Sequence, residues 1–113
     1  TEAALDILKP GITSHDLFLA MDHILRPDQS AQMGSDEIGR YGHGLGSQLT
    51  EPPSHANWDK TVIKEGMALT IEPSISYGDG LTMVAEENLL ILHDEVVLLS
   101  ERAPRDLPII FAP

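Results

Sequence analysis

The sequence contains no cysteine and few aromatic side chains. Without cysteine, neither a disulfide framework nor a thiolate metal site can form, so any metal ion must be held by nitrogen and oxygen ligands. The same absence is compatible with a reducing compartment, and we expect a cytoplasmic protein. Because aromatic residues make up only 4% of the chain, Tyr41, Trp58 and Tyr77 are explained by core packing as readily as by a substrate pocket.

Basic residues and long apolar runs are also scarce. The 18 acidic residues outnumber the 7 basic ones and give a formal net charge of -11, which argues against a nucleic acid or an anionic membrane surface as a partner. No apolar run approaches the roughly 20 residues of a membrane-spanning helix, and residues 1–4 lack the basic-then-apolar pattern of a signal peptide. Carboxylates are suitable ligands for divalent cations, although most of them are expected to be solvated.

The chain of 113 residues, 42% of them apolar, has the size and composition of one globular domain. A first helix is predicted to end at Lys9-Pro10-Gly11, and Thr13 is predicted to cap a second helix over residues 14–25. The spacing of apolar residues in the second helix predicts that it buries Leu17, Ala20, Met21, Ile24 and Leu25 and leaves His15, Asp16 and Asp22 in solvent.

The remainder of the chain predicts an antiparallel sheet. Residues 27–57 are rich in Gly, Ser, Pro and Gln and indicate an irregular connection around one short strand near Tyr41. An alternating apolar pattern begins at Met67 and ends at Glu72. Two further apolar runs, residues 83–92 and 95–99, flank His93-Asp94 as a hairpin turn. We expect the proline-containing tail to be extended and held by Leu107, Ile109 and Ile110.

A single histidine lies between glycines in Gly42-His43-Gly44-Leu45-Gly46. This spacing is not that of a dinucleotide-binding loop, but glycines on both sides allow backbone or a ligand to approach the imidazole closely. Glu72 and Glu87 lie in segments that are otherwise apolar, where a carboxylate is unfavourable unless it is paired or bound to a cation. The three side chains can meet around a metal ion; the alternative is a core histidine with exposed edge carboxylates.

Three segments in order resemble signatures of the pita-bread metallohydrolases, the superfamily of creatinase, methionine aminopeptidase and the Xaa-Pro peptidases. They are His43–Gly46 with Glu51-Pro52-Pro53, then residues 65–73, then residues 86–91. Residues 3–13 resemble the segment that precedes these signatures in Xaa-Pro peptidases. The resemblance spans nearly the whole chain and implies an α+β fold, the C-terminal part of a pita-bread domain, with residues 1–113 forming a partial catalytic domain of curved antiparallel sheet and flanking helices.

The resemblance also implies two divalent metal ions, which can be Mn, Co, Fe or Zn, held by two aspartates, one histidine and two glutamates. By motif position His43, Glu72 and Glu87 match the histidine and the two glutamates. Glu86 is the alternative to Glu87, because strand alternation places only one of the two on the site face. His43 and Glu72 are then catalytic, with a metal-bound hydroxide attacking the scissile amide and Glu72 relaying its proton to the leaving amine.

Two departures from the family pattern limit this interpretation. The aspartate ligands precede the opening helix in relatives, and Asp16 and Asp22 do not match them, so we expect the 113-residue chain alone to be inactive. Thr50 stands where relatives often carry a second histidine that contacts the substrate; a threonine hydroxyl donates a hydrogen bond but cannot shuttle protons near neutral pH. His55 either reaches the substrate from the same loop or is a surface histidine. The other histidines, His15, His23 and His93, are expected in solvent.

The leading functional hypothesis is an Xaa-Pro aminopeptidase or dipeptidase that acts on a peptide or small-molecule substrate and is a homodimer when full length. Within the same fold, a creatinase-like C–N hydrolase and a lyase of sulfonium compounds remain alternatives, because fold does not fix chemistry. A metal-free pita-bread module used for binding is a further alternative. Carboxylates inside apolar strands argue against the binding module.

Overall fold

The computed structural model describes residues 1–28, 39–106 and 108–111. Two helices and seven strands follow one another in these residues: α1 (Glu2–Ile7), α2 (Ser14–Leu25), β1 (Gly42–Leu45), β2 (Glu51–Ser54), β3 (Ala68–Ile71), β4 (Ser74–Tyr77), β5 (Leu81–Val84), β6 (Glu87–Ile91) and β7 (Val96–Leu98). Five strands form an antiparallel sheet in the order β2-β1-β3-β6-β7. The predicted α+β fold with an antiparallel sheet is confirmed.

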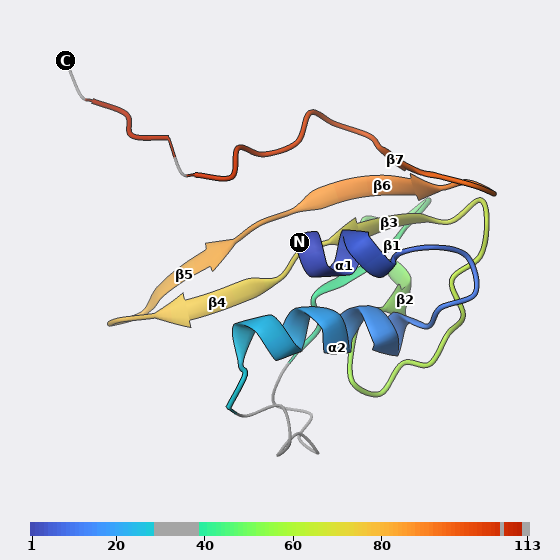
Figure 1. The fold of residues 1–113 in the computed structure, drawn as a ribbon, viewed down its shortest axis with the longest axis horizontal. Helices are drawn as coiled ribbons and strands as arrows, with labels where there is room; N and C mark the ends of the chain where they lie inside the picture. Colours follow the sequence, from blue (N-terminus) through green and yellow to red (C-terminus); the bar gives the residue numbers. More distant parts are fainter. Residues whose placement is uncertain (29–38, 107, 112–113) are drawn as a thin grey trace.

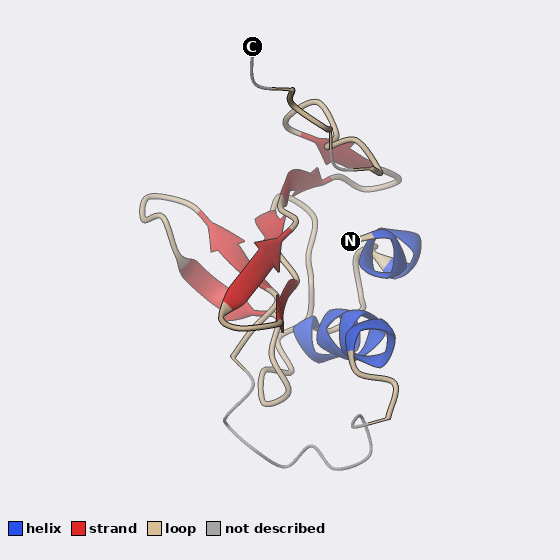
Figure 2. Ribbon diagram, turned by 90° about the vertical axis from the view of Figure 1, so that its left-hand side faces the viewer, coloured by secondary structure: helices blue, strands red, loops and turns tan. Residues whose placement is uncertain are grey.

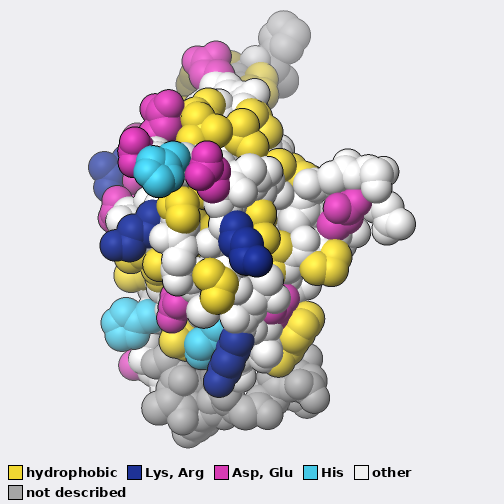
Figure 3. Space-filling model, turned by 90° about the vertical axis from the view of Figure 1, so that its right-hand side faces the viewer, with side chains coloured by type: hydrophobic (Ala, Val, Ile, Leu, Met, Phe, Trp, Pro, Cys, Tyr) yellow, Lys and Arg dark blue, Asp and Glu magenta, His cyan; other side chains and the backbone are white. Residues whose placement is uncertain are grey.

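The elements are arranged in two layers with one projection. Helices α1 and α2 lie side by side over one face of the five-stranded sheet (Figure 2). Strands β4 and β5 pair only with each other and extend away from the body as a two-stranded ribbon (Figure 1). The end of the molecule at the right of Figure 1 carries acidic, basic and apolar side chains interspersed (Figure 3). No helix in the described part of the chain is long and apolar enough to cross a bilayer.

Helix α2 forms over the predicted residues and begins at a capping box. The backbone N–H of Asp16 donates to Thr13 Oγ1 at 3.1 Å, and the backbone N–H of Thr13 donates to Asp16 Oδ2 at 2.8 Å. These bonds satisfy donors that a helix start would otherwise leave unpaired. The Thr13 hydroxyl also donates to Asp16 Oδ2 at 2.7 Å. This bond, followed by that from the Thr13 backbone N–H, lowers the pKa of Asp16. The predicted start of α2 is therefore confirmed.

The buried face of α2 differs from the predicted one. Ile24 is 67% exposed, whereas Phe18 is completely buried and Asp22 is only 1% exposed. The buried residues follow the 3.6-residue period of a helix and are Ser14, Leu17, Phe18, Met21 and Asp22. The prediction failed because it placed Asp22 outside the buried stripe on account of its charge. That charge is met inside the protein by Tyr41 and Arg26.

Two strand predictions also need correction. Residues 51–54, expected to be irregular, form β2 beside β1. The prediction was wrong because the tandem prolines hide the strand pattern in the sequence, although proline does not prevent pairing at a sheet edge. Part of the same irregular segment, residues 29–38, lies outside the described residues. The run over residues 83–92 is not one strand but two: β5 pairs with β4, and β6 pairs with β3. The hairpin turn at His93-Asp94 is confirmed by the pairing of β6 with β7.

The core lies between the helices and the near face of the sheet. It is made of aliphatic and aromatic side chains from both layers: Ala4, Leu8, Leu17, Phe18, Met21, Tyr41, Ile63, Leu69, Ile71, Leu89 and Ile91. None of the described tail residues, 102–106 and 108–111, belongs to it. Ile109 and Ile110 are 79% and 87% exposed, so the predicted anchoring by these two is wrong, and Leu107 lies outside the described residues. Prolines 104 and 108 remove backbone donors that pairing with the sheet would need.

Candidate metal centre

The register of the three central strands divides the candidate residues between two faces. His43 pairs with Thr70, which pairs in turn with Asn88, whereas Ile71 pairs with Glu87. Directly paired residues of an antiparallel ladder point to the same side of the sheet. His43 and Thr70 therefore share the face that points away from the helices, and Glu87 lies with Ile71 on the helix-facing side.

His43 and Glu72 come together on the face away from the helices. His43 Nε2 lies 3.3 Å from Glu72 Oε1. His43 Nδ1 lies 2.8 Å from the carbonyl oxygen of Gly44, and because a carbonyl can only accept, Nδ1 carries the hydrogen. Nε2 is the ring nitrogen that lies toward Glu72 and that is available to a metal ion. A histidine whose other nitrogen donates to a backbone carbonyl is typical of metal ligands.

The glycines beside His43 are required by close backbone contacts. A Cβ at Gly42 would lie 2.1 Å from the carbonyl oxygen of Thr70, and a Cβ at Gly44 would lie 2.3 Å from that of Pro52. Gly42 also has a φ of +144°, which side-chain-bearing residues rarely adopt. These glycines are thus explained by the close approach of other backbone to the strand that carries the histidine. The predicted close approach to the imidazole itself stays a prediction.

Glu86 and Glu87 have different surroundings. Glu87 is nearly buried, and its Oε1 lies 3.8 Å from Arg102 Nε. Glu86 is exposed, lies just before β6, and its Oε1 accepts a hydrogen bond from Thr70 Oγ1 at 3.2 Å. Because Thr70 is the register partner of His43, Glu86 lies on the side of the sheet that carries the histidine. The geometry favours Glu86, the alternative that the sequence left open.

The site is not assembled as a closed cluster. Among the residues that the structure describes, no three or more His, Cys, Asp or Glu side chains are grouped so that they could hold a metal ion. His43 and Glu72 form a pair, and Glu86 reaches the neighbouring Thr70. Asp16 caps α2 and Asp22 bonds to Tyr41 in the core, so neither aspartate faces this pair.

Thr50 lies in the exposed loop between β1 and β2. Glu51 closes this loop: its Oε1 accepts from the backbone N–H of Gln48 at 2.8 Å and from Ser47 Oγ at 3.0 Å. The backbone bond from Gln48, followed by the Ser47 hydroxyl, lowers the pKa of Glu51. The loop that carries Thr50 is thus held by its own hydrogen bonds.

One of the two predicted alternatives for His55, a surface histidine, is wrong. Its side chain is completely buried, its Nδ1 lies 3.2 Å from Ser14 Oγ, and its Nε2 has no hydrogen-bond partner among the described residues. Burial, and secondarily the nearby His43, lower the pKa of His55 to about 4, against a smaller opposing effect of Asp59. A neutral imidazole therefore fills the space behind Gly42.

The remaining histidines are outside the site. His23 and His93 are exposed, as predicted. His15 is only partly exposed, and its Nδ1 is buried without a partner in the described part of the chain, which corrects the prediction for this residue. Its neighbour Asp16 is exposed.

Sequence reasoning missed Thr70 and the backbone contact that Tyr41, expected only in core packing or a substrate pocket, makes with the site. Thr70 is a fully buried polar residue in an otherwise apolar strand. The signal available in the sequence was a threonine within an apolar run, because a hydroxyl that is buried there needs a partner. Tyr41 accepts the backbone N–H of Glu72 at its carbonyl oxygen, at 2.9 Å. No sequence pattern indicated that contact, since it depends on how β1 lies against the end of β3.

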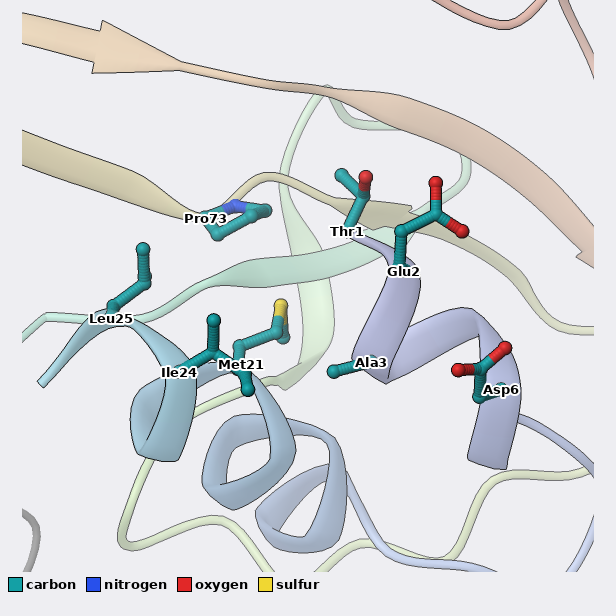
Figure 4. Close-up of a pocket in the computed structure, with 8 residues that line it drawn as sticks. All are labelled: Thr1, Glu2, Ala3, Asp6, Met21, Ile24, Leu25 and Pro73. Carbon is teal, nitrogen blue, oxygen red and sulfur yellow. The ribbon is translucent and has the colours of Figure 1, made fainter. Parts of the chain in front are cut away.

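A cavity of about 360 Å³ lies elsewhere, between α1 and α2 and beside Pro73 (Figure 4). Its walls are mostly apolar and include Ala3, Met21, Ile24, Leu25 and Pro73. Glu2 and Asp6 are its acidic members. Neither His43 nor Glu72 lines it, so the paired histidine and carboxylate, not this cavity, are the candidate for chemistry.

Comparison with known proteins points to a single family. The model of metallopeptidase family M24, Peptidase_M24, matches residues 1–94. The Xaa-Pro dipeptidase of Lactobacillus delbrueckii subsp. lactis is 38% identical over 91 residues, which are 80% of this chain and 24% of that protein. The Xaa-Pro dipeptidase of Lactobacillus helveticus is 34% identical over 110 residues, which are 96% of this chain and 28% of that protein.

A solved structure agrees with these sequence matches. Prolidase from Pyrococcus furiosus superposes on 91% of this chain and 30% of its own chain, with a TM-score of 0.75 and 30% sequence identity. The chain thus spans less than a third of the length of each of these three relatives.

Proposed function

The chain belongs to metallopeptidase family M24, and from this we propose that it supplies the histidine and glutamate part of a dinuclear metal site for hydrolysis of Xaa-Pro peptides. The observation that carries the proposal is the pair formed by His43 Nε2 and Glu72 Oε1 at 3.3 Å. The relatives named as Xaa-Pro dipeptidases support the substrate class. The homodimer predicted for the full-length protein stays a prediction.

The donor atoms of this region fit divalent ions. Imidazole nitrogen and carboxylate oxygen suit Mn, Co, Fe and Zn, and no thiolate competes. We propose Glu86 as the second glutamate ligand in place of Glu87. Glu87 faces the helices and has Arg102 as its counter-charge, whereas Glu86 lies at the Thr70 side of the sheet.

Bound divalent ions would polarise the scissile carbonyl and lower the pKa of a bound water. Glu72 is the candidate proton carrier: its side chain is 26% exposed, and its backbone N–H is fixed by the carbonyl oxygen of Tyr41. From this position its carboxylate would take a proton from the attacking water and give it to the leaving amine. Thr50 can donate a hydrogen bond to substrate from its exposed loop, and the enclosed His55 is assigned no substrate contact.

The proposed site is incomplete within this chain. The family's two aspartate ligands have no match here, and both Asp16 and Asp22 are engaged elsewhere. We therefore expect the 113-residue chain alone to bind metal weakly and to hydrolyse nothing. Hydrolysis is proposed for a protein that carries this sequence together with two such aspartates.

The test is metal analysis and activity of the natural protein that contains this sequence, with His43→Ala as the variant. We expect about one equivalent of Mn, Co, Fe or Zn or more and hydrolysis of Xaa-Pro dipeptides, both lost in the variant. Less than about half an equivalent of metal, with no hydrolysis after metal is added, would favour the metal-free binding module. Turnover of creatine or of a sulfonium compound instead of Xaa-Pro dipeptides would support the alternative enzymes and refute the peptidase.

A further inference from the structure

Tyr41 links helix α2 to the strand that carries His43. Its ring is 5% exposed and stacks on Phe18, with ring centroids 5.1 Å apart and an interplanar angle of 13°. Its hydroxyl donates to Asp22 Oδ1 at 2.9 Å. Asp22 is itself buried near the end of α2 and also pairs with Arg26. Burial, and then the bond to Asp22, raise the pKa of Tyr41, which keeps the hydroxyl protonated as a donor.

The backbone of Tyr41 forms hydrogen bonds with His55 and with Glu72, a member of the candidate site. Its N–H donates to the carbonyl oxygen of His55 at 2.8 Å, and its carbonyl oxygen accepts from the N–H of Glu72 at 2.9 Å. His43 is two residues further along the chain. A displacement of Tyr41 would therefore move Glu72 directly and His43 through one intervening residue.

This part of β1 has few side chains of its own. The residues on both sides of His43 are glycines, which contribute no side chain to packing, and the backbone at Gly42 has a positive φ. Tyr41 is the nearest upstream residue with a side chain, and that side chain is anchored by both stacking and a buried hydrogen bond. Pairing of β1 with β3 aligns the backbone of His43 with Thr70, and the anchored side chain of Tyr41 adds a constraint from the helix layer at the start of this strand.

We propose that Tyr41, fixed by Asp22, is a positioning residue of the metal site that sets the separation of His43 from Glu72. This inference rests on the proposed function. It assigns Tyr41 no contact with metal or substrate. Its effect is exerted through the backbone hydrogen bond to Glu72 and through the start of β1.

The experiment measures Mn²⁺ affinity in the 113-residue chain from paramagnetic broadening of the backbone amide NMR signals of Gly44 and Thr70, which lie beside His43 and are present in every variant. Tyr41→Phe removes only the hydroxyl, and we expect it to weaken Mn²⁺ binding about tenfold. Tyr77→Phe is the matched control, because Tyr77 lies exposed on the β4–β5 ribbon. It is expected to change affinity by less than about twofold.

A second control separates positioning from general loss of stability. Ile91→Val makes a small cavity in the same core at the opposite end of β6 from Glu86, and its Mn²⁺ affinity should stay within about twofold of the original. If Ile91→Val weakens binding as much as Tyr41→Phe, or if Tyr41→Phe matches Tyr77→Phe, the positioning role is overturned.

Two further variants complete the design. If Tyr41→Phe does not fold, Asp22→Asn removes the charge that fixes the hydroxyl, and about threefold weaker binding is expected; unchanged affinity overturns the inference. His43→Ala tests the proposed function separately. Unchanged Mn²⁺ affinity in that variant would reject the metal site itself, and the positioning role with it.

Discussion

The two faces of the central sheet are used differently. On the helix-facing side, Leu69, Ile71 and Leu89 are completely buried in the core. On the other side, β1 and β3 present His43 and Thr70, with Glu72 directly after β3 and Glu86 directly before β6. Because strand side chains alternate, neighbouring residues serve opposite purposes: stability depends on one face and the proposed chemistry on the other.

The largest expected difference between the two faces is in stability. Leu69→Ala should lower the free energy of unfolding by about 3–4 kcal/mol, because it leaves a cavity in the closed core. Leu90→Ala, on the neighbouring strand, removes the same atoms from a half-buried position on the opposite face. We expect a loss below about 2 kcal/mol there. Urea unfolding measures both, and equal losses would contradict the assignment of faces.

His55, behind β1, should make stability depend on pH. Its folded pKa of about 4 lies below the ordinary value of 6.5, so the unfolded chain takes up the proton first as pH falls. The stabilisation is complete above pH 6.5 and is lost as pH drops toward 4, by about 3 kcal/mol. Urea unfolding across this range measures the loss.

The matched variants for this prediction are His55→Leu and His23→Gln. His55→Leu removes the titrating group and should flatten the dependence between pH 6.5 and 4. His23 is exposed, so His23→Gln should leave it unchanged. A stability that does not vary over this range in the unaltered protein would show that His55 is protonated equally in both states.

Glu86 and Glu87 are adjacent in the sequence but lie on opposite faces of the sheet, so substituting each in turn compares the two faces directly. Glu86→Gln should weaken Mn²⁺ binding about tenfold or more, corresponding to about 1.4 kcal/mol, whereas Glu87→Gln should change it by less than about threefold. Titration with Mn²⁺ monitored by NMR measures both. The reverse order would restore Glu87, the residue favoured by motif position, as the ligand.

The smallest predicted effect concerns only the helix layer. Thr13→Ala removes the side-chain cap of α2 and should cost about 1 kcal/mol of unfolding free energy. Mn²⁺ affinity should not change, since the cap lies at the end of α2 away from Asp22. Thermal unfolding and the same metal titration are sufficient to check this. A changed affinity would show that the cap also affects the metal site.

Local patterns predicted much of the fold, whereas long-range contacts were not predictable. The cap at Thr13, the extent of α2 and the turn at His93-Asp94 depend on neighbouring residues, and each was found as expected. The burial of Asp22 depends on Tyr41, which is 19 residues away. Burial of a charge can be inferred from sequence only when its partner is known.

The candidate site shows the same limit. Motif position identified the His43 and Glu72 that the fold brings together. The choice between Glu86 and Glu87 required the register, because a shift of one residue exchanges the faces of a strand. The apolar run over residues 83–92 concealed the break before β6 that determines this register.

The β4–β5 ribbon has a consequence for how such proteins vary. Glu72 precedes β4 and Glu86 follows β5, so both lie at the base of the ribbon. A hydrogen bond from the Ala85 N–H to the Pro73 carbonyl oxygen, at 3.2 Å, closes this base. Paired residues can therefore be added to or removed from the tip without altering the spacing of the two carboxylates at its root. Length changes in steps of one residue per strand preserve pairing, so natural diversity and engineered loops can be accommodated at the tip.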